Sequence, residues 1–240
     1  SNKYFELFKE EPVFDGPYSN SSYQERITEA LNHFNSQQPI NVLKDWQSII
    51  FHLPYAFQGR RMIVNNWVSW LKENNELDKL TKEIGAFIKE DADLWYKKAS
   101  KSQLYQSFIN EKIASGEKAS SEIGNMYTAS IFMSFLSMLN YSLDNKKEIS
   151  GNKIGFLSYG SGSKSKIFEG TIETKWKTKI IDSKLFFHLS HRKKIDVNTY
   201  ELLHKNELEE CVLKNNSIHL CHIDLNPLRI GLRNYNKVNG

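Results

Sequence analysis

Hydrophobic residues recur along this chain with two different periods, which predicts a mixture of helices and strands. A first helix is predicted after the turn signal Asp15-Gly16-Pro17, because apolar residues follow it at helical spacing, at Ile27, Ala30, Leu31 and Phe34. Ser22 and Glu25 have the spacing of a capping box, so the helix is expected to begin at Ser22.

Short apolar runs predict three strands of a buried sheet. The first spans residues 46–53 around Ile49-Ile50-Phe51, and Pro54 ends it because proline cannot donate to a sheet ladder. The second spans residues 153–159, and the third, with alternating character, spans residues 167–174.

Longer periodic segments predict helices. One covers residues 58–73, and the highly charged residues 77–115 are expected to form two surface helices. Residues 127–143 are apolar on most faces, which is typical of a buried helix. The remaining elements are a short helix and two strands, at residues 196–206, 217–224 and 229–235. Together they indicate an α/β or α+β domain with a central buried helix.

The composition excludes several classes of protein. The net charge of +4 comes from scattered basic residues, which does not favour nucleic-acid binding. No apolar run reaches the roughly 18 residues of a membrane helix. Two cysteines, Cys211 and Cys221, are too few for a disulfide framework, so a cytoplasmic location is expected. Ser1-Asn2 have the character of a cleaved tag remnant, which leaves residues 3–240 as the predicted domain.

His52 is the first candidate for chemistry. It lies at the C-terminal end of the first predicted strand, at the edge of an open α/β sheet where ligands bind. The alternative is a half-buried histidine that is satisfied by a backbone carbonyl, which is common for this residue type.

Two glycine-containing segments are further candidates. Gly160-Ser161-Gly162 would let backbone amides approach a ligand, although the spacing differs from a nucleotide P-loop and a plain hairpin turn is the alternative. Gly124-Asn125 precedes the predicted buried helix, where Asn125 is either a simple N-cap or part of an anion-binding helix terminus.

The histidines near the C-terminus do not favour a metal site. His219 and His222 are three residues apart on a predicted strand, which places their side chains on opposite faces. No Gly-x-Ser-x-Gly nucleophile elbow is present, and the acidic Glu209-Glu210 before Cys211 would raise the pKa of its thiol.

Four motifs in order resemble the second half of 3-hydroxy-3-methylglutaryl-CoA (HMG-CoA) synthases. They are Asp15-Gly16-x-x-Ser19-x-x-x-Tyr23, Phe51-His52-x-Pro54-Tyr55, Gly124-Asn125-Met126-Tyr127-Thr128 and Ser158-Tyr159-Gly160-Ser161-Gly162. The resemblance covers nearly the whole chain, loosely over residues 77–115 and 175–216. It implies the C-terminal half of the α/β thiolase-like fold, a mixed sheet with a buried helix and helices on its faces.

The resemblance implies an acyltransferase that condenses acetyl-CoA with acetoacetyl-CoA in the mevalonate pathway, with no cofactor because the CoA thioesters are substrates. His52 would polarise the acetoacetyl ketone, which agrees with the chemistry of a developing alkoxide. Asn125 and Ser161 would contact the acyl chain, Ser19 would line the CoA tunnel, and Tyr127 and Tyr159 would wall the acyl pocket. A homodimer is also implied.

Two departures qualify this resemblance. Where the family usually has two lysines downstream of the histidine, this chain has Phe57 and Arg61, and arginine can still bind a phosphate. The family's cysteine nucleophile and glutamate belong to an N-terminal half that is absent here, so the chain is expected to be inactive alone. The alternatives are a polyketide β-branching HMG synthase that acts on carrier-protein acyl groups, and a non-catalytic acyl-CoA-binding module.

Overall fold

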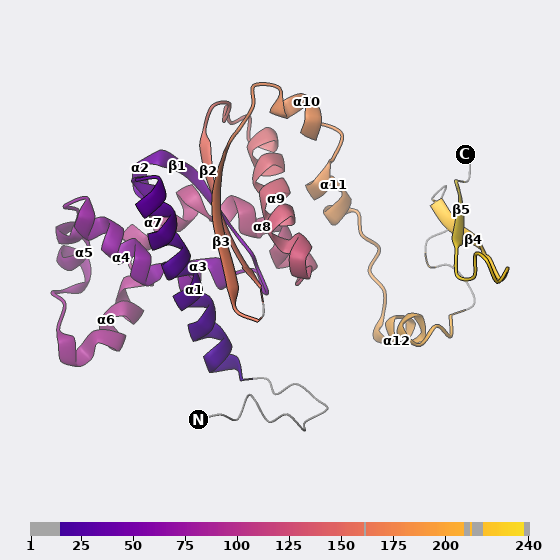
Figure 1. Ribbon diagram of the computed structural model, residues 1–240, viewed down its shortest axis with the longest axis horizontal. Helices are drawn as coiled ribbons and strands as arrows, with labels where there is room; N and C mark the ends of the chain where they lie inside the picture. The colour runs from indigo at the N-terminus through magenta and orange to yellow at the C-terminus, as the bar shows by residue number, and fades with distance from the viewer. Residues whose placement is uncertain (1–14, 161, 209–211, 213–217, 238–240) are drawn as a thin grey trace. The chain divides into compact units, whose positions relative to one another are not determined.

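The computed structural model describes residues 15–160, 162–208, 212 and 218–237 (Figure 1). The chain divides into two compact units, one that runs to Ser190 and one that begins at His191. The sequence pattern treats residues 3–240 as one domain, and we describe the two units separately.

A three-stranded sheet forms the centre of the first unit. The strand order is β1-β2-β3, with bounds Trp46–Phe51, Lys153–Gly160 and Lys164–Thr171. β1 and β2 are parallel, with Ile50 opposite Phe156, whereas β2 and β3 form an antiparallel hairpin. The three predicted strands are confirmed, although the third begins and ends three residues earlier than predicted. The pairing of Gly160 with Lys164 across the hairpin agrees with the turn alternative for the glycine-rich segment.

Both faces of the sheet are covered by helices. Ile49 and Phe51 point to one face, where they join a core with residues of α1 (Gly16–Gln37) and α7 (Gln103–Lys112). Ile50 points to the other face and packs with Ile131 and Met138 of α9 (Ser130–Asp144). Figure 1 shows α1 and α9 on opposite sides of the strands. Because both faces are buried, the apolar residues Ile49, Ile50 and Phe51 of β1 are consecutive rather than alternating.

The first helix begins six residues before the predicted capping box. Asp15 is its N-cap, and the Asp15 carboxylate accepts a hydrogen bond from the amide of Tyr18 at 2.9 Å. Asp15-Gly16-Pro17 is therefore a helix start and not a separate turn, since proline is favoured in the first turn of a helix. Ser22 lies within the helix.

The segment between β1 and α9 is more buried than its charge suggested. It holds six α-helices: α3 (Gln58–Met62), α4 (Val64–Glu73), α5 (Leu77–Ile84), α6 (Ala92–Ala99), α7 (Gln103–Lys112) and α8 (Ala114–Ile123). The same region contains two short 3₁₀ helices, η2 (Lys89–Asp91) before α6 and η3 (Tyr127–Ala129) before α9. One more short helix, α2 (Val42–Asp45), precedes β1. The prediction of two surface helices over residues 77–115 is wrong, because α5, α6 and α7 make three helices there and Leu80, Trp95 and Tyr105 are core residues.

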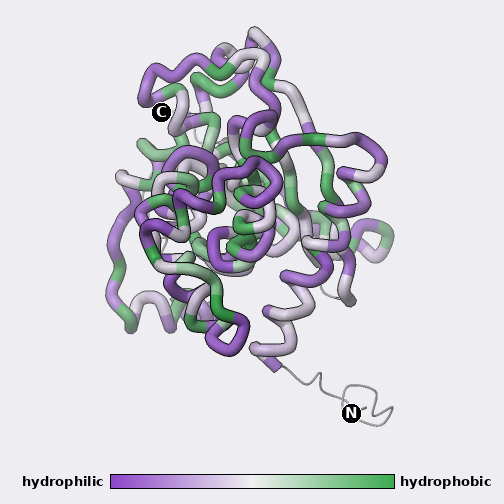
Figure 2. Tube along the Cα trace, turned by 90° about the vertical axis from the view of Figure 1, so that its left-hand side faces the viewer, coloured by the Kyte–Doolittle hydropathy of each residue, from purple (hydrophilic) through white to green (hydrophobic). Residues whose placement is uncertain are grey.

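The buried side of α9 is partly its small, polar side. Ser134, Ser137 and Asn140 are buried, whereas Phe132 is 63% exposed. A side chain at Gly116 of α8 would place its Cβ 2.7 Å from the Ser134 hydroxyl oxygen, so the two helices approach closely there. Small side chains permit this approach, and the predicted burial of residues 127–143 holds for only part of the helix surface. Figure 2 shows hydrophobic and hydrophilic stretches interspersed along the trace.

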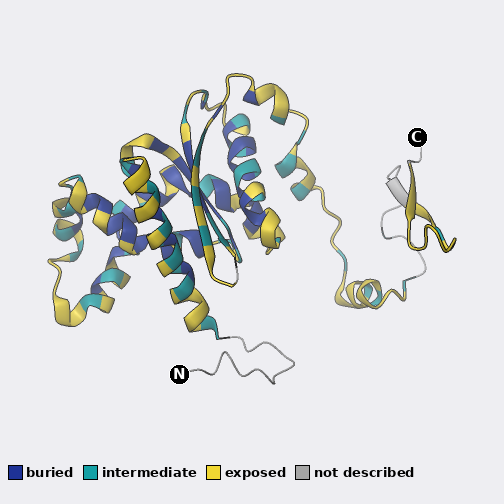
Figure 3. Cartoon of the chain, in the orientation of Figure 1, coloured by how far each residue is buried: buried dark blue, intermediate teal, exposed yellow. Residues whose placement is uncertain are grey.

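The first unit ends with α10 (Trp176–Ile180) and α11 (Leu185–Ser190). The second unit contains α12 (Val197–Lys205) and an antiparallel pair, β4 (Ile218–Ile223) and β5 (Arg233–Lys237). The short helix and both strands were predicted, although β5 begins four residues later than expected. None of the described residues of this unit is classed as buried (Figure 3). Within the described ranges, no helix is both long and apolar enough to cross a membrane.

Candidate active site

The backbone of His52 is held from two sides where β1 ends. The His52 amide donates to the carbonyl oxygen of Leu157 on β2 at 2.9 Å, which extends the sheet ladder by one residue. The His52 carbonyl oxygen accepts a hydrogen bond from the phenol of Tyr23 on α1, also at 2.9 Å. Burial raises the pKa of Tyr23, with a further contribution from Tyr159, so this phenol stays protonated and donates. The position of His52 is therefore set by a strand and a helix.

The imidazole of His52 is oriented by a third element, α9. Its Nδ1 lies 2.7 Å from the hydroxyl oxygen of Ser130, which is fully buried. The same oxygen accepts a hydrogen bond from the Leu53 amide at 3.1 Å. Burial lowers the pKa of His52, which favours the neutral ring. The imidazole therefore forms its hydrogen bond with a hydroxyl group. The alternative prediction for His52 was a hydrogen bond to a backbone carbonyl.

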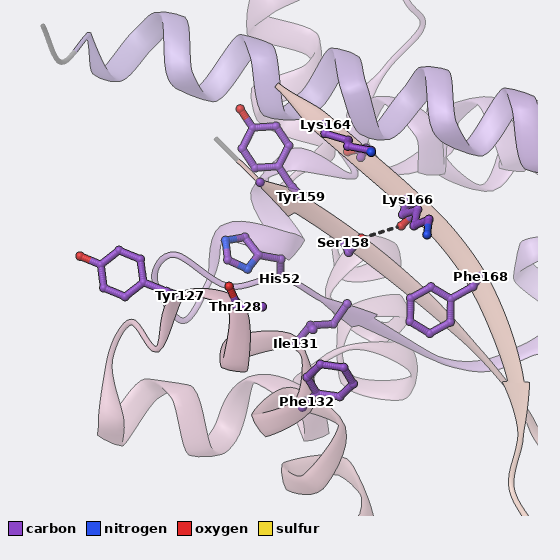
Figure 4. Close-up of a pocket in the computed structure, with 12 residues that line it drawn as sticks. His52, Tyr127, Thr128, Ile131, Phe132, Ser158, Tyr159, Lys164, Lys166 and Phe168 are labelled. Atoms are coloured by element: carbon purple, nitrogen blue, oxygen red, sulfur yellow. Dashed lines mark hydrogen bonds between the residues drawn. The ribbon is translucent and has the colours of Figure 1, made fainter. Parts of the chain in front are cut away.

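His52 lines a cavity of about 490 Å³ on the first unit (Figure 4). The walls come from η3 and the start of α9 on one side and from the β2–β3 hairpin on the other. The residues that line it are His52, Tyr127, Thr128, Ile131, Phe132, Ser158, Tyr159, Gly160, Lys164, Ser165, Lys166 and Phe168. Its volume is in the range of small-molecule sites, and the walls are mostly apolar with a few polar groups, as such sites usually are.

Two lysines give one wall of this cavity a positive charge. Lys164 and Lys166 lie on β3 two residues apart, so their side chains share one face of the strand with Phe168. In Figure 4, Ser158 and Tyr159 of β2 lie between these lysines and His52. The Ser158 hydroxyl donates to the carbonyl oxygen of Lys166 at 3.0 Å, which ties the two strands together at this wall.

The structure brings together three of the residues that the resemblance singled out, His52, Tyr127 and Tyr159. Tyr159 packs against Tyr23 with a ring centroid distance of 4.6 Å. Ser19 is exposed on α1, and Asn125 accepts a hydrogen bond from the Tyr127 amide at 2.7 Å, so it supports the turn before α9. Neither residue lines the cavity, and Ser161 lies outside the described residues. The roles predicted for these three in acyl-CoA binding stay predictions.

The arginines after His52 have different surroundings. Arg60 forms a bidentate ion pair with the buried carboxylate of Glu117, and its guanidinium lies 4.8 Å from the ring centroid of Phe57. Arg61 is exposed and donates to the phenol oxygen of Tyr55 at 2.8 Å. Arg61 does not line the cavity either, and its predicted phosphate contact stays a prediction. Of the two, Arg61 retains the greater access to a ligand.

Metal binding finds no support in the part of the chain that the structure describes, where no group of three or more His, Cys, Asp or Glu side chains could hold an ion. Cys221 is exposed and unpaired with another cysteine. Cys211 lies outside the described residues.

Sequence reasoning missed the residues that complete the site. Lys164 and Lys166 could have been found from their alternation with Phe168 once the third strand was extended to residue 164. Ser130 gave no such signal, because its contact with His52 joins positions 78 residues apart.

Comparison with known proteins shows the family to which the chain belongs. The family model described as "Hydroxymethylglutaryl-coenzyme A synthase C terminal" matches residues 3–226. The chain is 27% identical over 204 residues to a hydroxymethylglutaryl-CoA synthase of Haloferax volcanii, covering 80% of this chain and 46% of that protein. It is 28% identical over 181 residues to a mitochondrial hydroxymethylglutaryl-CoA synthase of Mus musculus, covering 68% of this chain and 35% of that protein.

Solved structures show the same fold. "MvaS in complex with 3-hydroxy-3-methylglutaryl coenzyme A" superposes with a TM-score of 0.68 at 22% identity, covering 97% of this chain and 53% of that one. The HMG synthase of the curacin biosynthetic pathway gives a TM-score of 0.64 at 18% identity, covering 95% and 53%. The predicted α/β thiolase-like fold is confirmed. The chain spans about half the length of the relatives it matches, and by its family match it belongs to the hydroxymethylglutaryl-CoA synthase C-terminal family.

Proposed function

We propose that this chain supplies the ketone-binding half of an active site that condenses acetyl-CoA with acetoacetyl-CoA and consumes water to give HMG-CoA and free CoA. The observation that carries the proposal is the placement of His52, held by Leu157, Tyr23 and Ser130 at the wall of a cavity of about 490 Å³. Two of these contacts hold the backbone of His52 and the third orients its imidazole. A group held in this way is preorganised for electrostatic stabilisation, which contributes more than a mobile group.

His52 acts on the acetoacetyl ketone in this proposal. Carbon–carbon bond formation at the ketone carbon converts its carbonyl into an alkoxide. An N–H of the imidazole that points at this oxygen stabilises the new charge, and the effect is large where the surroundings exclude water. Tyr127, Tyr159 and Ile131 form walls against which the acyl chain packs.

The lysines of β3 fit the other end of a CoA thioester. CoA carries phosphate groups, and Lys164 and Lys166 place two cations at the same cavity as His52. They supply positive charge in place of the lysine that the family usually has at the position of Phe57. Arg61, exposed near the end of α3, is a further candidate for a phosphate contact.

The nucleophile comes from elsewhere in this proposal. The family's mechanism needs a cysteine that takes up the acetyl group and a glutamate that handles the proton of its methyl carbon, and the resemblance assigns both to an N-terminal half. The chain pairs with that half, forms a homodimer and works in the mevalonate pathway of the cytoplasm. Isolated, it catalyses no condensation, because a covalent mechanism needs its nucleophile.

The decisive experiment is His52→Ala in the complete synthase, in which this chain is joined to the cysteine-bearing half. Turnover should fall by about 10²- to 10⁴-fold, the range for loss of a positioned proton donor, while CoA binding persists. His33→Ala, which changes an exposed histidine of α1, is the matched control. Unchanged turnover in His52→Ala would remove His52 from the mechanism, and condensation by the pure isolated chain would overturn the proposed division of labour.

Carrier-protein substrates are the competing possibility. The curacin HMG synthase, which shares the fold, has been solved in complex with a donor carrier protein. Met126-Tyr127-Thr128 resembles the CoA-dependent enzymes more closely, which favours free CoA thioesters for this chain. Comparing turnover of the complete synthase on acetoacetyl-CoA and on acetoacetyl carrier protein decides between the two, since only a CoA enzyme should use the free thioester efficiently.

A further inference from the structure

The hydroxyl group of Ser130 accounts for more than the position of His52. Its oxygen accepts a hydrogen bond from the Leu53 amide, which can only donate. The hydroxyl hydrogen therefore needs an acceptor, because Ser130 is fully buried and an unused donor there is costly. Among the described residues, Nδ1 of His52 at 2.7 Å is the acceptor within hydrogen-bond distance.

This pattern distinguishes the two neutral forms of the imidazole. A neutral ring carries its proton on one nitrogen and accepts a hydrogen bond at the other. If Nδ1 accepts from Ser130, the proton is on Nε2. If Nδ1 carried the proton, it would donate to the Ser130 oxygen, and the hydroxyl hydrogen would lose its acceptor.

We propose that Ser130 is a positioning residue that sets the tautomer of His52, so that Nδ1 accepts and Nε2–H is the donor presented to the cavity. The relay runs from the Leu53 amide through the Ser130 hydroxyl to Nδ1. In the described part of the chain, no protein group forms a hydrogen bond with Nε2, which leaves its N–H to the ligand. The same relay disfavours the imidazolium, because protonation of Nδ1 would displace the hydroxyl hydrogen from its buried acceptor.

The relay changes what His52 does in the proposed reaction. A neutral ring with a fixed Nε2–H stabilises the alkoxide by donating a hydrogen bond, and it does not need to arrive protonated. This consequence rests on the proposed function, whereas the tautomer itself rests on the contacts of Ser130 alone.

The tautomer can be measured in the 240-residue chain without turnover. Long-range ¹H–¹⁵N spectra of histidine-labelled protein distinguish a protonated ring nitrogen from a bare one, at about pH 8, above the ordinary histidine pKa of about 6.5. We expect one form for His52, with the proton on Nε2. In Ser130→Ala both forms should appear, and Ser130→Thr, which keeps the hydroxyl, should restore the single form.

Ser137→Ala is the matched control. Ser137 is also fully buried on α9, accepts from the Ala119 amide at 3.1 Å and donates to the Ser115 carbonyl oxygen at 2.7 Å. Its removal should cost similar stability and leave the His52 tautomer unchanged. A proton on Nδ1 in the unaltered chain, or a His52 tautomer that does not respond to Ser130→Ala, would overturn the assignment.

Activity provides a separate arm in the complete synthase. Ser130→Ala should lower kcat by roughly 10- to 100-fold with a smaller change in KM, the same range as for groups that orient histidines in metal sites. If the tautomer responds and the complete protein still shows no condensation, the proposed function fails and the role of Ser130 stands. If the tautomer does not respond while His52→Ala abolishes turnover, the role of Ser130 fails and the proposed function stands.

Discussion

The phenol of Tyr23 donates a hydrogen bond to the backbone carbonyl oxygen of His52 at 2.9 Å, so the first helix of the chain holds the residue at the end of β1. Tyr105 makes an equivalent bond elsewhere, from its own buried phenol to the carbonyl oxygen of Arg60. Both tyrosines are 1% exposed, which makes them a matched pair.

Replacing each tyrosine by phenylalanine separates stability from function. Either change leaves a carbonyl oxygen without its donor, and we expect the free energy of unfolding to fall by about 1–2 kcal/mol in both. Only Tyr23→Phe releases the backbone of His52, so only that variant should lower turnover of the complete synthase, by about 10-fold or more. Urea denaturation and steady-state kinetics check the two halves of this prediction. Equal loss of turnover in both variants would contradict it.

His52 should make the stability of the chain depend on pH in one window. Burial lowers its pKa in the folded state, so the unfolded chain binds a proton more readily than the folded chain. Its contribution is therefore fully present above the ordinary pKa of about 6.5 and is lost as pH falls from there through the lowered folded value. Denaturation near pH 7.5 and pH 5.5 should show a smaller pH dependence in His52→Gln than in the unaltered chain. His33→Gln, at an exposed position, should keep the full dependence, and an identical dependence in all three proteins would exclude His52 as the source.

The positive wall of the cavity predicts salt-sensitive ligand binding. The double substitution Lys164→Ala/Lys166→Ala should raise the Kd for CoA by about 5- to 30-fold at low ionic strength, since exposed charge contacts contribute roughly 0.5–1 kcal/mol each. The difference should shrink in about 0.5 M salt because of screening. Lys97→Ala/Lys101→Ala removes the same charge from exposed positions around the end of α6 and should leave the Kd unchanged. Equal weakening in both double variants would mean that only net charge matters.

The contact between Trp46 and Gly155 predicts a steric requirement in the sheet. A Cβ at Gly155 would lie 2.0 Å from Cε3 of the Trp46 indole, which is fully buried. Gly155→Ala should therefore destabilise the fold by about 3 kcal/mol, at the upper end of the usual cost of overpacking. Gly160→Ala, on the same strand, meets no described atom within 4 Å and should change stability by no more than about 0.5 kcal/mol. Similar midpoints in urea for the two variants would contradict this assignment of the contact.

The sequence pattern by itself determined the three strands of the central sheet, the helix that contains Ile27 and Leu31, and the position of His52 at a strand end. These features depend on local periodicity and on Pro54, so they can be read from neighbouring residues. The high charge of residues 77–115 led to a wrong prediction of surface helices, because lysines and glutamates on the exposed faces surround Leu80, Trp95 and Tyr105, which are buried. Local pattern also misplaced the start of α1, where Asp15 and not Ser22 is the cap.

Tertiary structure alone decided which side chains surround His52. Ser130 and Tyr23 reach it from α9 and α1, and Lys164 and Lys166 share its cavity because β3 pairs with β2. A periodicity argument identifies the face on which a residue lies, but it does not identify the partner across 29 or 78 residues of chain. Those partners depend on strand register and helix packing, which the whole chain determines together, and they set the hydrogen bonds of His52.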